Sequence, residues 1–288
     1  MWIFRGKLQH NDELAADLLN RSFKFGDGLF ETIRVYHHQP LFLRDHFQRL
    51  TDGMRALGFE FAEDLFLADV QRAIQTLMDQ AQIGTHGRLR LSVFRDGQGA
   101  YGPLDDTPQF AIEGYSLKTD YYAAETSMSL TDYRELAVSE NTISSFKTAS
   151  ALPYVLAARH ARKEGFDEAL LFTKNGLGIS HIAEGASTNL FLVTDRKITT
   201  PPLSTGCVSG IMRKQVIALA EQLKLPCSEK SLRERDLLKA DEVFLTNAIR
   251  GIVPVSRYKD QGWDMRAVPI VRMLQGCLGK VVKPRPPR

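Results

Sequence analysis

The chain is poor in the features that would indicate a metal site, a disulfide framework or a membrane span. Its 288 residues include three cysteines, Cys207, Cys227 and Cys277, whose spacing matches neither a zinc site nor a set of disulfides. No run reaches the roughly 18 consecutive apolar residues of a membrane span, and no secretory signal follows Met1. We therefore expect no metal, no membrane association and a cytoplasmic location.

The chain also lacks an excess of charge of one sign. It has 37 Lys+Arg against 34 Asp+Glu, a net charge of +3, and the basic residues are scattered except in the tail at residues 283–288. A nucleic-acid surface would show clustered basic residues with interleaved aromatics, so we expect no nucleic-acid partner. The 43% hydrophobic and 25% charged residues are typical of a globular protein, and the length favours two domains.

The first part of the chain combines strand and helix patterns. Alternating apolar residues predict strands, and apolar residues at helical spacing predict helices. The expected strands are residues 1–8, 30–36, 88–94 and 110–115, and the expected helices are residues 44–57 and 64–82. Residues 116–125 show no periodicity and are the expected linker. The sequence therefore predicts a small N-terminal α+β domain over residues 1–118.

In the second part of the chain, strand and helix patterns alternate. The expected strands are residues 127–133, 168–173, 188–193 and 242–246, and the expected helices are residues 149–163, 210–223 and 232–239. The tail at residues 283–288 is expected to be disordered. This alternation predicts a larger C-terminal α/β domain over residues 119–288.

Two stretches carry groups suited to an aldehyde and to a ring nitrogen. Lys147 lies in Ser144-Ser-Phe-Lys-Thr-Ala-Ser150, just before an apolar run of helical spacing. A lysine that is partly desolvated there can lose its proton and attack an aldehyde, although a surface lysine explains the same pattern. Glu184 precedes a buried strand, where a carboxylate can hold a protonated ring nitrogen; a solvated turn residue is the alternative.

Two further stretches are suited to a phosphate. In Thr205-Gly-Cys-Val-Ser-Gly-Ile-Met-Arg213, glycines precede a helix whose first N–H groups and dipole favour an anion. In Phe244-Leu-Thr-Asn-Ala-Ile-Arg-Gly-Ile-Val-Pro-Val255, a strand ends at Thr-Asn, whose backbone and side-chain donors could supply further phosphate contacts. Glycine-rich helix starts and turns after strands are common, so the four stretches indicate a site only together.

In this order, the four stretches resemble the class-IV aminotransferase family, the fold type IV pyridoxal-phosphate enzymes. The resemblance also includes Phe25-Gly-Asp-Gly28 and His46-Phe-Gln-Arg-Leu50, and it extends to Val255. The family includes branched-chain aminotransferases, D-amino acid aminotransferases and 4-amino-4-deoxychorismate lyases. The resemblance implies a mixed α+β and α/β fold of two domains, like that of D-amino acid aminotransferase. It also implies pyridoxal 5'-phosphate in the cleft between the domains, and a homodimer.

The resemblance assigns roles to individual residues. It makes Lys147 the Schiff-base lysine and proton shuttle, and Glu184 the partner of the cofactor's ring nitrogen. Arg49, in His-x-x-Arg-Leu, matches the family's phosphate-binding arginine. The other positions of the family's phosphate site are matched by Ile211, Met212, Asn247 and Ala248.

Departures from the family's patterns bear on the choice within it. Branched-chain aminotransferases usually have a tyrosine five residues after the lysine, where this chain has Leu152, and the nearest tyrosine is Tyr154. Many aminotransferases have a threonine where this chain has Ala248. Asn247-Ala248 and Gly210-Ile-Met-Arg213 resemble the lyases instead.

Arginines are the natural anchors for a substrate carboxylate, because the guanidinium fork binds it through two hydrogen bonds. A lyase of a dicarboxylic ring substrate needs two cations, and Arg90 and Arg250 are the expected pair. The residues expected to contact substrate are Phe25, Arg34, Arg90, Tyr154 and Arg250. The glycine-rich residues 97–103 fall where family members place a loop over the substrate, and they are a candidate lid.

Three functions follow from the resemblance, all with a small-molecule amine or amino acid as the partner. The favoured one is 4-amino-4-deoxychorismate lyase, which eliminates pyruvate to give p-aminobenzoate in folate biosynthesis. The alternative is an aminotransferase of branched-chain or D-amino acids. A remote alternative is a non-catalytic cofactor-binding scaffold, which would have no need of Lys147 beside Glu184 and Arg49.

Overall fold

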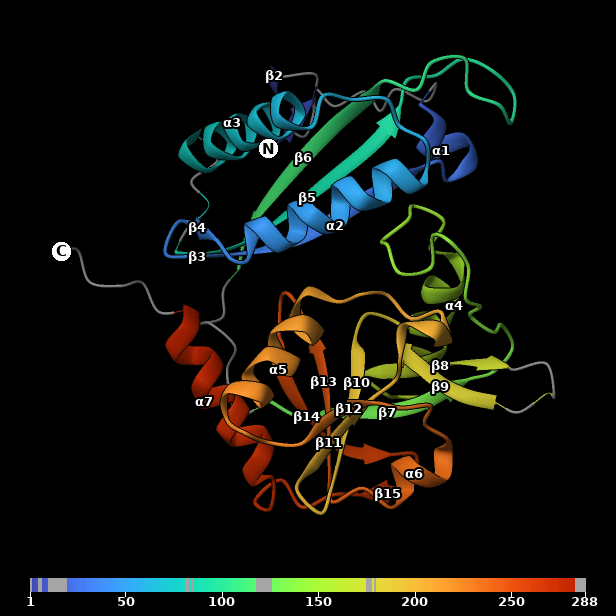
Figure 1. Cartoon of the computed structure of the whole chain (residues 1–288), viewed down its shortest axis with the longest axis vertical. Helices are drawn as coiled ribbons and strands as arrows, with labels where there is room; N and C mark the ends of the chain where they lie inside the picture. Colours follow the sequence, from blue (N-terminus) through green and yellow to red (C-terminus); the bar gives the residue numbers. More distant parts are fainter. Residues whose placement is uncertain are drawn as a thin grey trace. The chain divides into compact units, whose positions relative to one another are not determined.

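The computed structural model describes residues 2–4, 7–9, 20–80, 83, 85–117, 126–174, 178 and 180–282. The chain forms two compact units (Figure 1): unit 1 is Met1–Tyr121 with Phe146–Ala151, and unit 2 is Tyr122–Ser145 with Leu152–Arg288. The segment Phe146–Ala151, which falls within the predicted C-terminal domain, groups with unit 1. Most of the predicted linker, residues 118–125, and the tail at residues 283–288 lie outside the described residues.

Unit 1 is an antiparallel sheet covered by helices. Its described strands are β1 (Trp2–Phe4), β2 (Lys7–Gln9), β3 (Gly28–Tyr36), β4 (Gln39–Pro40), β5 (His86–Arg95) and β6 (Pro108–Ser116), in the order β2-β1-β6-β5-β3-β4. Its described helices are α1 (Arg21–Phe25), α2 (Leu43–Ala56) and α3 (Glu63–Gln80). Strands β3 and β5 pair along their full length, from Gly28 opposite Phe94 to Tyr36 opposite His86. This long ladder fixes the register of the residues on β3 that the site uses.

The core of unit 1 follows from two periodicities. Leu29, Ile33 and Val35 alternate along β3, and α2 adds Leu50 and Met54 at helical spacing. All five side chains are buried in one cluster with residues of α3, β5 and β6. Each of these side chains stabilises the unit by about 1.5–3 kcal/mol when it leaves water. The sheet and its helices therefore form a rigid base for the segments that follow β3 and β5.

Unit 2 is a mixed sheet with helices packed on it (Figure 1). Its described strands are β7 (Met128–Tyr133), β8 (Glu168–Lys174), β9 (Ser180–Gly185), β10 (Asn189–Thr194), β11 (Lys197–Thr200), β12 (Cys227–Glu229), β13 (Glu242–Asn247), β14 (Gly251–Tyr258) and β15 (Gln261–Gly262). Its described helices are α4 (Leu152–Lys163), η1 (Leu203–Thr205), α5 (Ile211–Gln222), α6 (Glu234–Leu238) and α7 (Pro269–Val282). The strand order is β12-β11-β10-β13-β14-β7-β8-β9, with β15 beside β14. Strand β7 is parallel to both β14 and β8.

Two of the apolar clusters in the described part of unit 2 link its strands to one another and to helix α4. One joins strands through side chains such as Leu130, Leu190 and Leu245, and the other seats Ala157 and Ala161 of α4 against β8. Helix α5 packs against β13 and α7. Within the described residues, no helix has the length and apolar character needed to cross a membrane.

Most of the predicted strands and helices are confirmed, and three differ. In the strand predicted at residues 1–8, the described residues Trp2–Phe4 form one short strand, which pairs with a second, Lys7–Gln9. The helix predicted at residues 149–163 begins at Leu152, because Thr148 and Ala149 pair with β3. The helix predicted at residues 232–239 is the shorter α6. Several described elements were not predicted, among them α1, β9, β14 and α7.

Candidate active site

Lys147 is fixed in unit 1 by backbone pairing with β3. Phe30 N donates to Lys147 O at 2.8 Å, and Ala149 N donates to Gly28 O at 2.8 Å. Both bonds follow the lysine Cα and flank Thr148, so they fix the backbone immediately after Lys147 against β3. Lys147 therefore lies on an extended segment beside β3, ahead of α4.

Lys147 and Arg90 both contact the ring of Phe30. Lys147 Nζ is 4.7 Å from the ring centroid, and Arg90 Cζ is 3.9 Å from the same centroid. Burial lowers the pKa of Arg90, and the Glu113 carboxylate, 3.6 Å away, acts in the opposite direction. An arginine keeps its charge under such a shift, so an amine and a permanent cation share one aromatic ring.

Arg49 lies on α2 and is held by a buried carboxylate on β3. Its Nε and Nη2 donate to the two oxygens of Glu31 at 2.8 and 2.5 Å, and His46 Nδ1 is 2.6 Å from Glu31 Oε2. Burial of Glu31 favours its neutral form, but the Arg49 guanidinium and the His46 ring outweigh burial and lower its pKa to about 2. Arg49 is thus oriented by a two-pronged ion pair.

The Glu31 carboxylate is expected to make unfolding sensitive to acid. Its pKa falls from 4.5 to about 2 on folding, so the ionised form stabilises the fold by about 3 kcal/mol above pH 4.5. That contribution is lost as the pH falls from 4.5 toward 2. Glu31→Gln cannot titrate, so urea unfolding of the cofactor-free proteins should give a difference in stability that is large at pH 7 and much smaller at pH 2.5. The same difference at both pH values would contradict this role.

In unit 2, Glu184 is buried on β9 and accepts three hydrogen bonds. Tyr154 OH and Val208 N donate to Oε1 at 2.8 and 3.0 Å, and Asn189 Nδ2 donates to Oε2 at 3.2 Å. Burial, followed by the Glu184 charge, raises the pKa of Tyr154, which keeps the hydroxyl a donor. The same two causes raise the pKa of Cys207 to about 11 and keep this thiol protonated. The surroundings therefore support a carboxylate at position 184.

The start of α5 offers backbone donors beside this carboxylate. Gly210 is the N-cap, and no side chain of the described residues caps the helix. A Cβ at Gly210 would lie 1.9 Å from Asn189 Oδ1, so only glycine permits this approach. Ile211 and Met212 begin the helix and are buried. Their side chains anchor the helix start while its first N–H groups stay uncapped.

A buried hydroxyl lies on the strand next to Asn189. Thr246 is directly opposite Asn189 in the β10–β13 pairing, so the two side chains share a face of the sheet. Thr246 Oγ1 is buried and has no hydrogen-bond partner among the described residues. Buried polar groups are normally satisfied, so this hydroxyl is suited to a ligand oxygen. Uncapped helix N–H groups and an unused hydroxyl on one unit fit an anion such as phosphate.

Asn247 and Ala248 form the turn after β13. Asn247 Oδ1 accepts from Ile249 N at 3.0 Å and from Arg250 N at 2.7 Å. The side-chain oxygen of Asn247 therefore holds the turn. Arg250 is exposed, with Nη1 3.4 Å from Met128 Sδ. Arg250 and Arg90, the pair of arginines expected to bind substrate carboxylates, therefore belong to different units: Arg250 to unit 2 and Arg90 to unit 1.

The remaining sequence-predicted substrate residues lie in three places. Arg34 is buried on β3, and Phe25 is the last residue of α1, half-exposed. Tyr154, on α4, donates its hydroxyl to Glu184 and so belongs to the surroundings of that carboxylate.

A sequence model of one family covers most of the chain. The family described as amino-transferase class IV matches residues 28–258. The chain belongs to this family.

Relatives and solved structures place the chain among several class IV enzymes. It is 28% identical to a D-alanine aminotransferase of Bacillus licheniformis, covering 90% of this chain and 88% of the relative. The structure of an Escherichia coli branched-chain amino acid aminotransferase superposes with a TM-score of 0.85 at 25% identity, covering 97% and 93% of the two chains. The structure of a 4-amino-4-deoxychorismate lyase from Pseudomonas aeruginosa superposes with a TM-score of 0.83 at 25% identity, covering 98% of this chain and 99% of the lyase. The fold is that of the fold type IV transaminases.

Class IV enzymes use pyridoxal phosphate, and the residues of this chain suit that cofactor. Its aldehyde requires an amine such as Lys147, and its ring nitrogen requires a buried carboxylate such as Glu184. Its phosphate requires N–H and hydroxyl donors such as those at the start of α5 and at Thr246, together with a cation such as Arg49.

Four parts of these surroundings were not predicted from the sequence. They are Glu31 and His46 beside Arg49, the link from Tyr154 to Glu184, and the unpartnered hydroxyl of Thr246. For one of these four, Glu31, the sequence contains a usable pattern. Glu31 alternates with Leu29, Ile33 and Val35, which places its carboxylate on the core face of the strand. Such a carboxylate needs a cation, and the nearby His46-Phe-Gln-Arg49 supplies it. The other contacts join segments far apart in sequence and leave no local pattern.

Proposed function

We propose that this class IV enzyme binds pyridoxal 5'-phosphate through Lys147, Glu184 and Arg49, and acts on an amine that carries a carboxylate. The observation that carries the proposal is the ring of Phe30, which both Lys147 Nζ and the Arg90 guanidinium contact. One aromatic ring thus contacts both an amine that can exchange with the substrate amine and a cation that can bind the substrate carboxylate. Ile211, Met212, Asn247 and Ala248 would add backbone contacts to the phosphate.

Lys147, Glu184 and Arg90 have different roles in the proposed reaction. When bound, pyridoxal phosphate supplies a ring that accepts the electron pair left by a broken substrate C–H bond. Lys147 Nζ would hold the cofactor aldehyde and, when free, would take that proton as a general base. Glu184 would favour the protonated form of the ring nitrogen, and Arg90 would bind the substrate carboxylate.

The specific reaction that we propose is that of 4-amino-4-deoxychorismate lyase. The support is the run Asn247-Ala248 after β13 together with Gly210-Ile-Met-Arg213 at the start of α5, both of which resemble the lyases. The superposition with the Pseudomonas aeruginosa lyase, which spans 99% of that chain, agrees with it. In this reaction one C–H bond and the C–O bond to the enolpyruvyl group break, and the proton ends on the departing group as pyruvate. No water or second substrate is consumed.

A transaminase of D-amino or branched-chain amino acids is the second candidate. The D-alanine aminotransferase, at 28% identity, and the Escherichia coli branched-chain enzyme, with a TM-score of 0.85, favour it. In that reaction Lys147 would return the proton to the cofactor instead of to a leaving group.

Product analysis separates the two candidates. Purified enzyme with pyridoxal phosphate is incubated with 4-amino-4-deoxychorismate, and pyruvate and p-aminobenzoate are measured. Equal amounts of the two products support the lyase. If the enzyme aminates 2-oxoglutarate with D-alanine or L-leucine and releases no pyruvate from the chorismate substrate, the transaminase is the supported function. If neither reaction occurs, the catalytic proposal is wrong and the cofactor-binding scaffold is favoured.

The proposal includes a homodimer located in the cytoplasm. The family resemblance supports the dimer, and the low cysteine content supports a reducing compartment. Sedimentation of the purified protein at the mass of two chains of 32.4 kDa would support the dimer, and sedimentation at the mass of one would contradict it.

A further inference from the structure

Glu168, the first residue of β8, carries a carboxyl group that is almost completely buried. It is 2% exposed, and its Oε2 accepts from Ser187 Oγ at 2.7 Å, from Ser187 N at 3.2 Å and from Thr188 Oγ1 at 3.3 Å. Its Oε1 accepts from Ala169 N at 3.2 Å. Burial raises the pKa of Glu168, and these hydrogen bonds oppose the shift. The carboxyl group therefore binds donors of its own strand and of the turn at residues 186–188.

This turn joins two strands that both contribute to the candidate site. Glu184 lies near the end of β9, and Asn189 is the first residue of β10. Gly185 N donates to Thr188 O at 2.7 Å, which closes the turn. A Cβ at Gly185 would lie 2.3 Å from Thr188 Oγ1 and 3.1 Å from Glu168 Cγ. The turn thus packs directly on the Glu168 side chain.

Asn189 connects the turn to the Glu184 carboxylate. Its Nδ2 donates to Glu184 Oε2 at 3.2 Å and to Val208 O at 2.9 Å. Val208 N in turn donates to Glu184 Oε1 at 3.0 Å. Asn189 directly follows Thr188, which Glu168 binds, so a displacement of the turn would also displace the Asn189 amide. The hydrogen bonds to both oxygens of Glu184 therefore depend on the position of the turn.

We propose that Glu168 is a positioning residue for the cofactor, which holds the turn at residues 186–188 and, through Asn189, sets the orientation of the Glu184 carboxylate. The inference rests on the proposed function, since it requires Glu184 to bind the ring nitrogen of pyridoxal phosphate. A carboxylate suits this task because it only accepts hydrogen bonds, and Ser187 N and Ala169 N can only donate. Without an acceptor at position 168, the turn must shift to satisfy its donors.

Titration of the cofactor-free enzyme with pyridoxal phosphate tests the inference without any turnover. Glu168→Leu keeps a side chain of similar size but has no acceptor, and it should raise the Kd about tenfold. Glu168→Gln should raise the Kd less than about threefold, because its amide oxygen can still accept from Ser187 and Thr188. In a Glu184→Gln background, Glu168→Leu should change the Kd less than about twofold, since its effect passes through Glu184.

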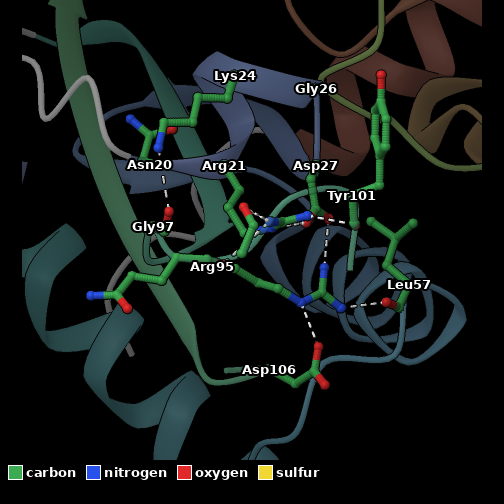
Figure 2. A network of polar contacts seen from close by, with 12 residues as sticks. Asn20, Arg21, Lys24, Gly26, Asp27, Leu57, Arg95, Gly97, Tyr101 and Asp106 are labelled. Carbon is green, nitrogen blue, oxygen red and sulfur yellow. Dashed lines mark hydrogen bonds and ion pairs between the residues drawn. The ribbon is translucent and has the colours of Figure 1, made fainter. Parts of the chain in front are cut away.

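Two controls remove carboxylates that do not contact the turn. Glu242→Leu makes the same substitution at another buried glutamate of unit 2, which accepts from backbone N–H groups at the start of α7. Asp106→Asn weakens a polar network of unit 1, in which Arg95 donates to Asp27 and Asp106 (Figure 2). Both control variants should keep the wild-type Kd.

Several outcomes would overturn the inference. Equal rises in Kd in Glu168→Leu and Glu242→Leu, or a tenfold effect of Glu168→Leu that persists in the Glu184→Gln background, would assign Glu168 a general structural role. If Glu168→Leu does not fold, Ser187→Ala replaces it, because Ser187 is exposed and its hydroxyl donates to Glu168. This variant should raise the Kd about threefold, and an unchanged Kd would contradict the inference. A wild-type enzyme that binds no pyridoxal phosphate would instead remove the proposed function.

Discussion

Replacing Lys147 by alanine is expected to reduce kcat at least about 10³-fold, because the variant loses both the amine that bonds to the cofactor aldehyde and the general base. The neighbouring structure should persist, since Lys147 is tied to β3 through its backbone oxygen, which alanine keeps. The measurement is single-turnover kinetics with the amine substrate, followed through the visible absorption of the bound cofactor.

Two further variants separate the chemistry of Lys147 from its charge. Lys147→Arg keeps a cation over the Phe30 ring but has no amine that can lose its proton, so it should be as inactive as alanine. Lys163→Ala removes an exposed lysine at the end of α4 and should leave kcat unchanged. Substantial activity in Lys147→Arg would mean that position 147 contributes only charge.

Glu184→Gln should lower kcat about 10²- to 10³-fold, since a neutral amide cannot hold the proton on the cofactor's ring nitrogen. The amide oxygen of glutamine can still accept from Tyr154 OH and Val208 N, whereas its NH2 group cannot accept from Asn189 Nδ2, so the variant keeps the shape but loses the charge and one hydrogen bond. The measurement compares kcat of the variant and wild type, both saturated with cofactor.

A graded pair of controls accompanies this variant. Tyr154→Phe removes one of the three donors to Glu184 and should lower kcat by about tenfold or less, because Val208 N still binds the same oxygen. Glu242→Gln alters another buried glutamate of unit 2, which accepts from Ile270 N and Val271 N at the start of α7, and should leave kcat near the wild-type value. Equal losses in Glu184→Gln and Glu242→Gln would indicate a general effect on unit 2.

The elements that could be predicted from the sequence are those with an uninterrupted apolar period. Strand β3 and helix α2 belong to this class, since their buried residues follow spacings of two and of three to four. Strand β14 contains Pro254, which argues against an inner strand. It is accommodated because the pairing with β7 begins only at Val255. Helix α7 contains Gly276 and Gly279, which weaken a helical signal.

The location of the proposed site residues could not be predicted from local patterns. The motif around Lys147 indicates a reactive lysine, yet its membership of unit 1 depends on hydrogen bonds to Phe30 and Gly28, far away in the sequence. Glu168 carries no local signal, because its role depends on the Ser187 and Thr188 donors of a turn that follows β9. Local patterns therefore predict which chemistry is present, and long-range backbone pairing determines where it lies.

The point of attachment of the cofactor is the most direct measurement of the central claim. Borohydride reduces the bond between a lysine and the cofactor aldehyde to a stable amine, and peptide mass spectrometry then locates the label. We predict that the enzyme loaded with pyridoxal phosphate carries the label on Lys147 alone. A label on another lysine, or an unlabelled Lys147 in the loaded and reduced enzyme, would contradict the assignment.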